Sequence, residues 1–143
     1  MIEKEKSSIE DRMASLDEAR LAAAAEPAIE PDLPIIDPHH HLWDFHKHRY
    51  LLDELLADTN SGHNIEQTVF IECAVFYRPD VGKAMRVVSE VEFVNGIAAM
   101  AASGRYGPTK VAAGIVGMAD LTLGAAVEDV LAAQVQAGGG RFK

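Results

Sequence analysis

Short apolar runs alternate with longer amphipathic stretches along most of the chain. Residues 33–37, 68–76 and 111–119 are nearly continuous apolar runs of strand length. Because these runs are apolar on both faces, they are typical of parallel strands that helices cover on both sides. The pattern therefore predicts a parallel sheet.

Helices are expected after each of these strands. The sequence predicts one helix over residues 50–57, a second that ends at Ser103, and a third over residues 124–137, which the glycines at 138–140 terminate. Residues 141–143 then stand where a fourth strand would begin. A strand followed by a helix, three times over, predicts an α/β chain.

Residues 1–32 differ in character from the rest of the chain. They combine many charges with an alanine-rich stretch, which predicts an exposed helix that packs lightly. Pro27, Pro31 and Pro34 then exclude a continuous helix and predict an extended linker. We therefore expect an N-terminal helix and linker over residues 1–32 and a domain over residues 33–143.

The composition fits one globular domain, with 143 residues, 48% hydrophobic positions and a formal net charge of -9. This charge disfavours binding to nucleic acid or anionic lipid, so the expected partners are small molecules or proteins. No apolar run approaches the roughly 20 residues of a membrane span, and the N-terminus lacks a signal-peptide pattern, which favours a cytoplasmic location. The single cysteine, Cys73, excludes an internal disulfide framework.

The densest concentration of chemical groups lies in residues 35–44, where three consecutive histidines follow an apolar run and Asp37. Side chains alternate along an extended segment, so His39 and His41 are expected on one face and His40 on the other. Two imidazoles on one face form half of a metal site, because zinc binds imidazole nitrogen and needs further ligands. The alternative is a polar turn after the strand.

Glu72 interrupts the second apolar run. A buried carboxylate is costly unless it is paired or lies at a solvated strand end, so Glu72 either lines a pocket or is a hydrogen-bonded structural group. Cys73 points to the opposite face and is expected to be an inert core thiol. Asp120 is expected to cap a helix or to border the same pocket. His46 and His48, a second His-x-His pair, are expected in a solvated loop.

The segment Ile-Asp-Pro-His-His-His-Leu-Trp-Asp at residues 36–44 resembles the opening strand of the amidohydrolase-2 group of the amidohydrolase superfamily. Shorter similar stretches lie at residues 48–50, 93–100, 107–109, 113–117 and 138–142, so the resemblance covers about residues 33–143. It implies a metal-dependent hydrolase of TIM-barrel fold, in a group that includes lactonases. By this similarity, His39 and His41 match the two histidines that bind metal in metal-bearing members. Leu51 and Leu52 stand where other members often have a Pro-Trp pair.

With this resemblance, the expected fold is a partial TIM (β/α)8 barrel with three βα units and the start of a fourth strand, since a closed barrel takes at least about 200 residues. The expected function is hydrolysis of a lactone or related carbonyl substrate, in which water attacks the carbonyl and a carboxylate from a later strand accepts its proton. His39, His41 and Glu72 are the candidate catalytic residues. His39 and His41 are also expected to hold a divalent metal such as zinc, although metal dependence varies within this group.

Two alternatives remain open. In the first, the chain is catalytically incomplete and is inactive alone or acts only in association with another chain, where exposed strand edges would favour a homo-oligomer. In the second, it is another metal-dependent barrel hydrolase of the deoxyribonuclease type. The net acidity argues against the second alternative.

Overall fold

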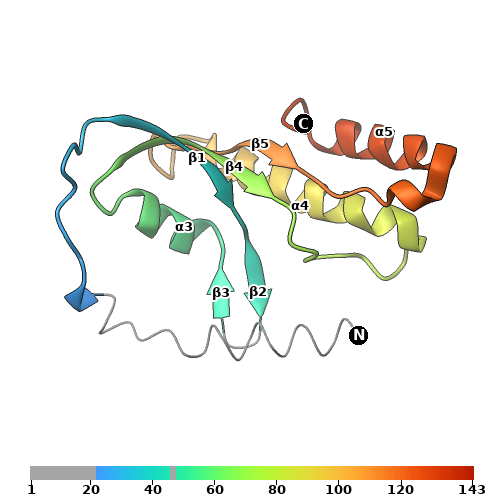
Figure 1. Ribbon diagram of the computed structural model, residues 1–143, viewed down its shortest axis with the longest axis horizontal. Coiled ribbons are helices and arrows are strands. Elements are labelled where there is room, and N and C mark those ends of the chain that lie inside the picture. The colour runs from blue at the N-terminus through green and yellow to red at the C-terminus, as the bar shows by residue number, and fades with distance from the viewer. Residues whose placement is uncertain (1–21, 46–47) are drawn as a thin grey trace.

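The structure is a computed structural model that describes residues 22–45 and 48–143. The strands are β1 (Pro34–His40), β2 (Trp43–Phe45), β3 (His48–Tyr50), β4 (Asn64–Ile71) and β5 (Lys110–Val116); the α-helices are α3 (Leu52–Thr59), α4 (Arg86–Ala101) and α5 (Val127–Ala137); and the 3-10 helices are η1 (Lys83–Met85) and η2 (Leu121–Ala126). Three parallel strands form the main sheet in the order β1, β4, β5 (Figure 1). The antiparallel pair β2–β3 continues from the end of β1 and leads into α3.

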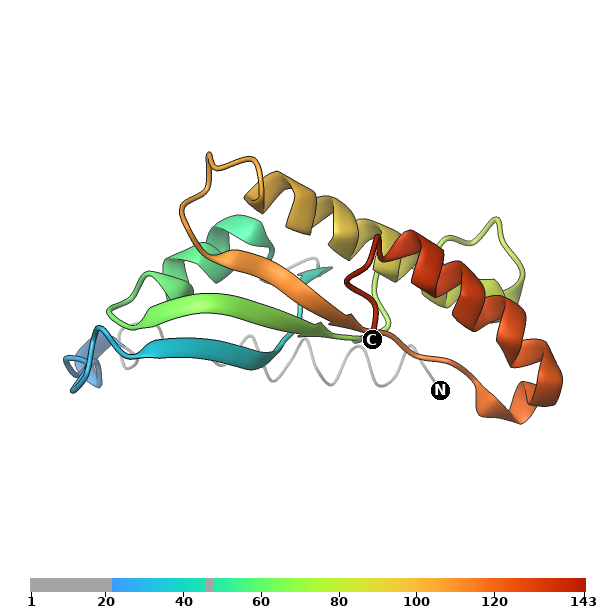
Figure 2. The ribbon, with the colours of Figure 1, turned by 90° about the horizontal axis from the view of Figure 1, so that it is seen from above.

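Helices α3 and α4 lie on the same side of the main sheet (Figure 2). Helix α4 buries Val91, Val94 and Ala98, which follow the three- and four-residue spacing of an amphipathic helix. These side chains belong to one core cluster with Phe70 of β4 and Ile115 of β5. The core therefore lies between the main sheet and α4, with α5 packed along α4.

The main sheet is irregular at Ala112. This fully buried residue has a φ of 48°, which non-glycine residues rarely adopt, and the register between β4 and β5 shifts beside it. The N–H of Ala112 donates to Oγ1 of Thr68 at 2.9 Å, and the Thr68 hydroxyl bonds to Nε2 of His40 at 2.9 Å. One buried hydroxyl thus joins all three parallel strands.

The predicted α/β class and parallel sheet are confirmed, but the predicted partial TIM barrel is wrong. Residues 43–50 do not lead directly from a strand into a helix, as a βα unit requires, because they form the antiparallel pair β2–β3. Residues 141–143 make only an isolated parallel bridge, between Ile115 and Phe142, and no fourth strand. Within the described residues, the chain is a small α/β domain with a three-stranded parallel sheet, a two-stranded antiparallel sheet and three α-helices.

The helix expected within residues 1–32 lies outside the described residues except for residues 22–23, which are helical. From residue 24 to β1 the described chain contains turns and irregular backbone. None of the helices in the described part of the chain has the length and apolar character needed to cross a membrane.

Candidate functional site

His39 and His41 come together at the carboxyl end of β1. Their Nε2 atoms lie 3.2 Å apart, and their rings meet edge to face. Nδ1 of His41 lies 2.7 Å from the carbonyl oxygen of Ile71, at the end of β4. Because a carbonyl only accepts, Nδ1 must carry the proton, which leaves the Nε2 lone pair of neutral His41 directed toward His39. The expectation that these two histidines share a face is confirmed.

His40 has a structural role on the opposite face. It is 6% exposed, and its ring packs edge to face against Phe70. Its Nδ1 lies 3.4 Å from the His41 carbonyl, which can only accept, so in the neutral ring the proton is on Nδ1 and Nε2 accepts from the Thr68 hydroxyl. Burial lowers the pKa of His40, so this ring is held in its neutral form between the two site histidines.

A hollow of about 410 Å³ lies beside the histidine pair. Asp37, Trp43, Tyr50 and Asp58 line it together with the three histidines. Oδ1 of Asp37 accepts the backbone N–H of His39 at 3.1 Å, and the Tyr50 hydroxyl donates to Oδ2 of Asp58 at 2.5 Å. Burial and the neighbouring Asp58 raise the pKa of Tyr50, which keeps its hydroxyl protonated. The hollow thus combines imidazoles, carboxylates and an aromatic wall.

The charges around this hollow are negative. No lysine or arginine of the described residues lines it. The nearby Arg49 of β3 contacts Asp53 at 3.3 Å and Glu54 at 3.4 Å on the exposed start of α3. The carboxylates that line the hollow therefore disfavour a substrate that carries its own negative charge close to them.

The histidine pair fits two ligands of a divalent cation. Two nitrogen ligands of a tetrahedral zinc ion, each about 2.0–2.1 Å from the metal, lie about 3.3 Å apart. The Nε2 separation of 3.2 Å agrees with this spacing, and the carbonyl on Nδ1 of His41 is the outer partner that metal-binding histidines usually have. Within the described residues no three or more histidine, cysteine, aspartate or glutamate side chains are grouped to hold a metal ion, so His39 and His41 form half of a metal site there.

Glu72 follows β4 directly and does not line this hollow. It is half-buried and acts electrostatically on Cys73, Tyr77 and Glu90, while its own N–H donates to the Val116 carbonyl at 2.9 Å. Its catalytic role stays a prediction. Burial, with Glu90 nearby, raises the pKa of the Cys73 thiol to about 12, as expected for an inert core cysteine.

Two further sequence expectations concern residues away from the pair. Asp120 caps η2, since its Oδ1 accepts the Thr122 N–H at 3.0 Å. His48 belongs to β3, with its Nε2 buried, so the expected loop is wrong at this position. His46 lies outside the described residues.

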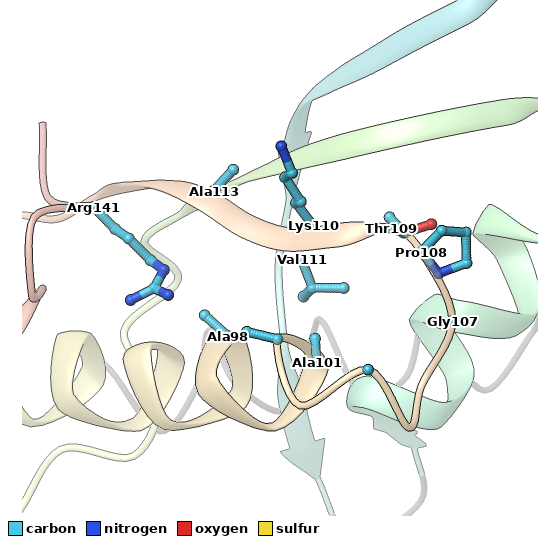
Figure 3. A pocket seen from close by; sticks show the side chains of 11 residues that line it. Ala98, Ala101, Gly107, Pro108, Thr109, Lys110, Val111, Ala113 and Arg141 are labelled. Atoms are coloured by element: carbon cyan, nitrogen blue, oxygen red, sulfur yellow. The ribbon is translucent and has the colours of Figure 1, made fainter.

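A second hollow of about 530 Å³ lies between α4 and β5 (Figure 3). Its walls are mostly small side chains, including Ala98 and Ala101, and Arg141 points into it from the end of the chain. Nη1 of Arg141 is bound to Oδ1 of Asn95 at 2.7 Å. Among the described residues that line this hollow there is no histidine, cysteine or carboxylate, and its ionisable side chains are Lys110 and Arg141.

Sequence reasoning missed several residues of the candidate site. Tyr50 and Asp58 meet because α3 packs back against β3, and no local sequence pattern predicts this contact. Glu90 could have been found from the sequence, because it is a carboxylate on the apolar face of a helix, between Val87 and Val94.

A comparison of the chain with protein-family models, with curated proteins and with solved structures finds no match.

Proposed function

We propose that this chain hydrolyses a lactone or related carbonyl compound at the His39–His41 pair, with a divalent cation such as zinc. The single observation that carries the proposal is the convergence of the two Nε2 atoms at 3.2 Å, with the His41 ring fixed by the Ile71 carbonyl. This arrangement is the preorganised nitrogen pair that a hydrolytic metal site needs. The resemblance of residues 36–44 to the amidohydrolase-2 motif supports the same chemistry.

When bound, the cation would polarise the substrate carbonyl and lower the pKa of an attacking water. His39 and His41 supply Nε2 ligands, and Asp37 is the carboxylate available as a base, because only its Oδ1 is engaged by His39. The water oxygen adds to the carbonyl carbon and its proton passes to Asp37. The ring C–O bond then breaks, and the leaving alkoxide takes up this proton.

The substrate fits the hollow best if it is uncharged. The rings of Trp43 and Tyr50 pack against each other, with centroids 5.7 Å apart, and form an aromatic wall that can cover a substrate ring, while Asp58 holds the Tyr50 hydroxyl in place. Asp37 and Asp58 repel a carboxylate-bearing substrate. A neutral lactone is therefore preferred over its anionic analogue.

The second candidate function is that of a chain that is catalytically incomplete alone and acts only with another chain. The observation that favours it is that the described residues supply two nitrogen ligands and no third. A second copy or another partner would then supply the remaining ligands. The cytoplasmic location stays a prediction for either function.

An activity screen tests the proposed function. The zinc-supplemented chain is assayed against neutral lactones and against matched lactones that carry a carboxylate. We expect hydrolysis of the neutral set, removal of activity by a chelator, and a loss of at least about 100-fold in His41→Ala, since a metal ligand is removed. His63→Ala is the matched control, because His63 is exposed directly before β4 and does not line the hollow beside the pair. Equal activity in wild type and His41→Ala would refute the proposal.

A further inference from the structure

Glu90 is a carboxylate in the core of the domain. It lies on α4 and is only 1% exposed, on the helix face that also buries Val87 and Val94. Burial raises its pKa, because a charge is poorly solvated at this position. An apolar side chain would fill the same space with a smaller desolvation cost, so the hydrogen bonds of Glu90 must account for the carboxylate at this position.

The hydrogen bonds of Glu90 all reach the segment that follows β4. Its Oε1 accepts the backbone N–H of Cys73 at 3.1 Å and that of Val75 at 3.0 Å. In the same segment Ala74 and Phe76 have φ values of 60° and 55°, a conformation that costs energy for residues with a side chain. Glu90 thus holds an otherwise unfavourable turn by its two amides.

This turn is joined to the histidine pair at two points. The carbonyl of Ile71, two residues before Cys73, accepts from Nδ1 of His41 at 2.7 Å. The Cys73 thiol lies 3.4 Å from the carbonyl of Leu42, the residue after His41. The Ile71 carbonyl shares its peptide group with the Glu72 N–H, which donates to the Val116 carbonyl of β5 at 2.9 Å. The Cys73 N–H that Glu90 accepts belongs to the next peptide group, so Glu90 acts on the backbone directly adjacent to the group that orients the His41 ring.

We propose that Glu90 is a positioning residue for the histidine site, which holds the Ile71 carbonyl where it fixes the His41 ring and directs Nε2 toward His39. The importance of Glu90 for catalysis rests on the proposed function. Its effect on the orientation of the His41 ring can be measured whether or not the chain is a hydrolase. Glu90 acts through the Cys73 and Val75 amides and touches neither His39 nor His41. What the site requires is an oxygen acceptor at this point, and a negative charge is dispensable.

The test compares two substitutions at Glu90 with a control on the same helix. Glu90→Met keeps the volume and removes both acceptors, whereas Glu90→Gln keeps an acceptor oxygen and removes the charge. Glu92→Met is the control, because the Glu92 side chain is 52% exposed on α4. If Glu90→Met does not fold, Glu90→Asp replaces it, since its oxygens are withdrawn by one methylene.

The first readout is the tautomer of His41, measured by nitrogen-15 NMR of the metal-free protein. Wild type, Glu90→Gln and Glu92→Met should all show His41 protonated at Nδ1. Glu90→Met should show a mixture of tautomers, because water replaces the Ile71 carbonyl. If His41 remains protonated at Nδ1 in a folded Glu90→Met or Glu90→Asp chain, the inference is overturned, and Glu90 stabilises only the turn that follows β4.

The second readout is zinc affinity, which Glu90→Met should weaken about 10- to 100-fold, as the loss of an outer partner usually does. Glu90→Gln should retain the wild-type affinity within about threefold. The two proposals fail separately. A wild-type chain that binds no zinc refutes the proposed function, while the tautomer comparison still decides the role of Glu90.

Discussion

Removal of the Thr68 hydroxyl is expected to be among the most destabilising conservative changes in this domain. Thr68 is fully buried, and its Oγ1 bonds to Nε2 of His40 and to the N–H of Ala112, each at 2.9 Å. Thr68→Val keeps the shape of the side chain and leaves both partners unpaired. Those partners are themselves buried, with His40 6% exposed and Ala112 fully enclosed, so water does not replace the hydroxyl.

The magnitude follows from these two unpaired groups. Each buried polar group without a partner costs about 1–3 kcal/mol, so we expect Thr68→Val to lower the free energy of unfolding by about 3 kcal/mol. For a domain of this size that corresponds to a fall of about 10–15 °C in Tm. Urea unfolding followed by circular dichroism measures the free energy, and a thermal scan measures Tm.

Two control variants separate the hydroxyl from other effects. Thr68→Ser keeps the hydroxyl and should lose about 1 kcal/mol, for the missing methyl group. Thr109→Val removes a single hydrogen bond, from Oγ1 of Thr109 to the Ile65 carbonyl at 2.9 Å, and should cost about 1 kcal/mol. The reasoning is refuted if Thr68→Val lies within about 0.5 kcal/mol of wild type, or if it costs no more than Thr109→Val.

Three further predictions concern titratable groups. Because the pKa of His40 is lowered from 6.5 in the folded chain, the unfolded chain binds a proton more readily at this residue. The contribution of neutral His40 to the free energy of unfolding should be fully present above pH 6.5 and should fall as the pH drops toward the folded pKa. A pH series of urea midpoints measures this fall, which should be smaller in His40→Leu. Because the pKa of Glu90 is raised from 4.5 in the folded chain, the free energy of unfolding falls as the pH rises above 4.5. Glu90→Gln should therefore have a higher Tm than wild type at pH 8, and this difference in Tm should disappear near pH 4.5. An equal difference in Tm at both pH values would contradict this account. Cys73 should react with iodoacetamide at pH 8 at least about 100-fold more slowly in the folded chain than in urea, since its thiolate is scarcely populated when folded, and equal rates would contradict its raised pKa.

The strands of the main sheet were predictable because their apolar runs record burial directly. The runs that begin near residues 33, 68 and 111 became β1, β4 and β5, with the middle strand beginning earlier, at Asn64. The part of β4 before Thr68 alternates in exposure, so its sequence does not form an apolar run. The irregularities at Ala112 and beside Ile35 leave no local signal, because they depend on contacts between strands.

The partial barrel was wrong because motif resemblance does not determine how the chain continues after the first strand. Trp43 and Phe45 stack along β2 with ring centroids 6.2 Å apart, and Trp43 meets Tyr50 of β3 across the pair at 5.7 Å. Such cross-strand aromatic pairs stabilise a hairpin that local composition does not predict.

For the candidate site, strand alternation was sufficient to place His39 and His41 on one side and His40 on the other. The outer groups were not predictable in the same way. Ile71 contributes a backbone carbonyl, which any residue has, and Asp58 contacts Tyr50 through the packing of α3. Glu72 was selected because it interrupts an apolar run, whereas the most buried carboxylate of the described residues is Glu90.

Zinc binding by the purified chain is the most direct test of the central claim, that His39 and His41 form a cation site through their Nε2 atoms. Zinc is titrated in competition with a chromophoric chelator. The account predicts one bound ion per chain or per assembled pair of chains, a loss of at least about 10-fold in affinity in both His39→Ala and His41→Ala, and wild-type affinity in His63→Ala. An affinity that is unchanged in His39→Ala and His41→Ala, or no zinc binding by wild type at any chain concentration, would contradict it.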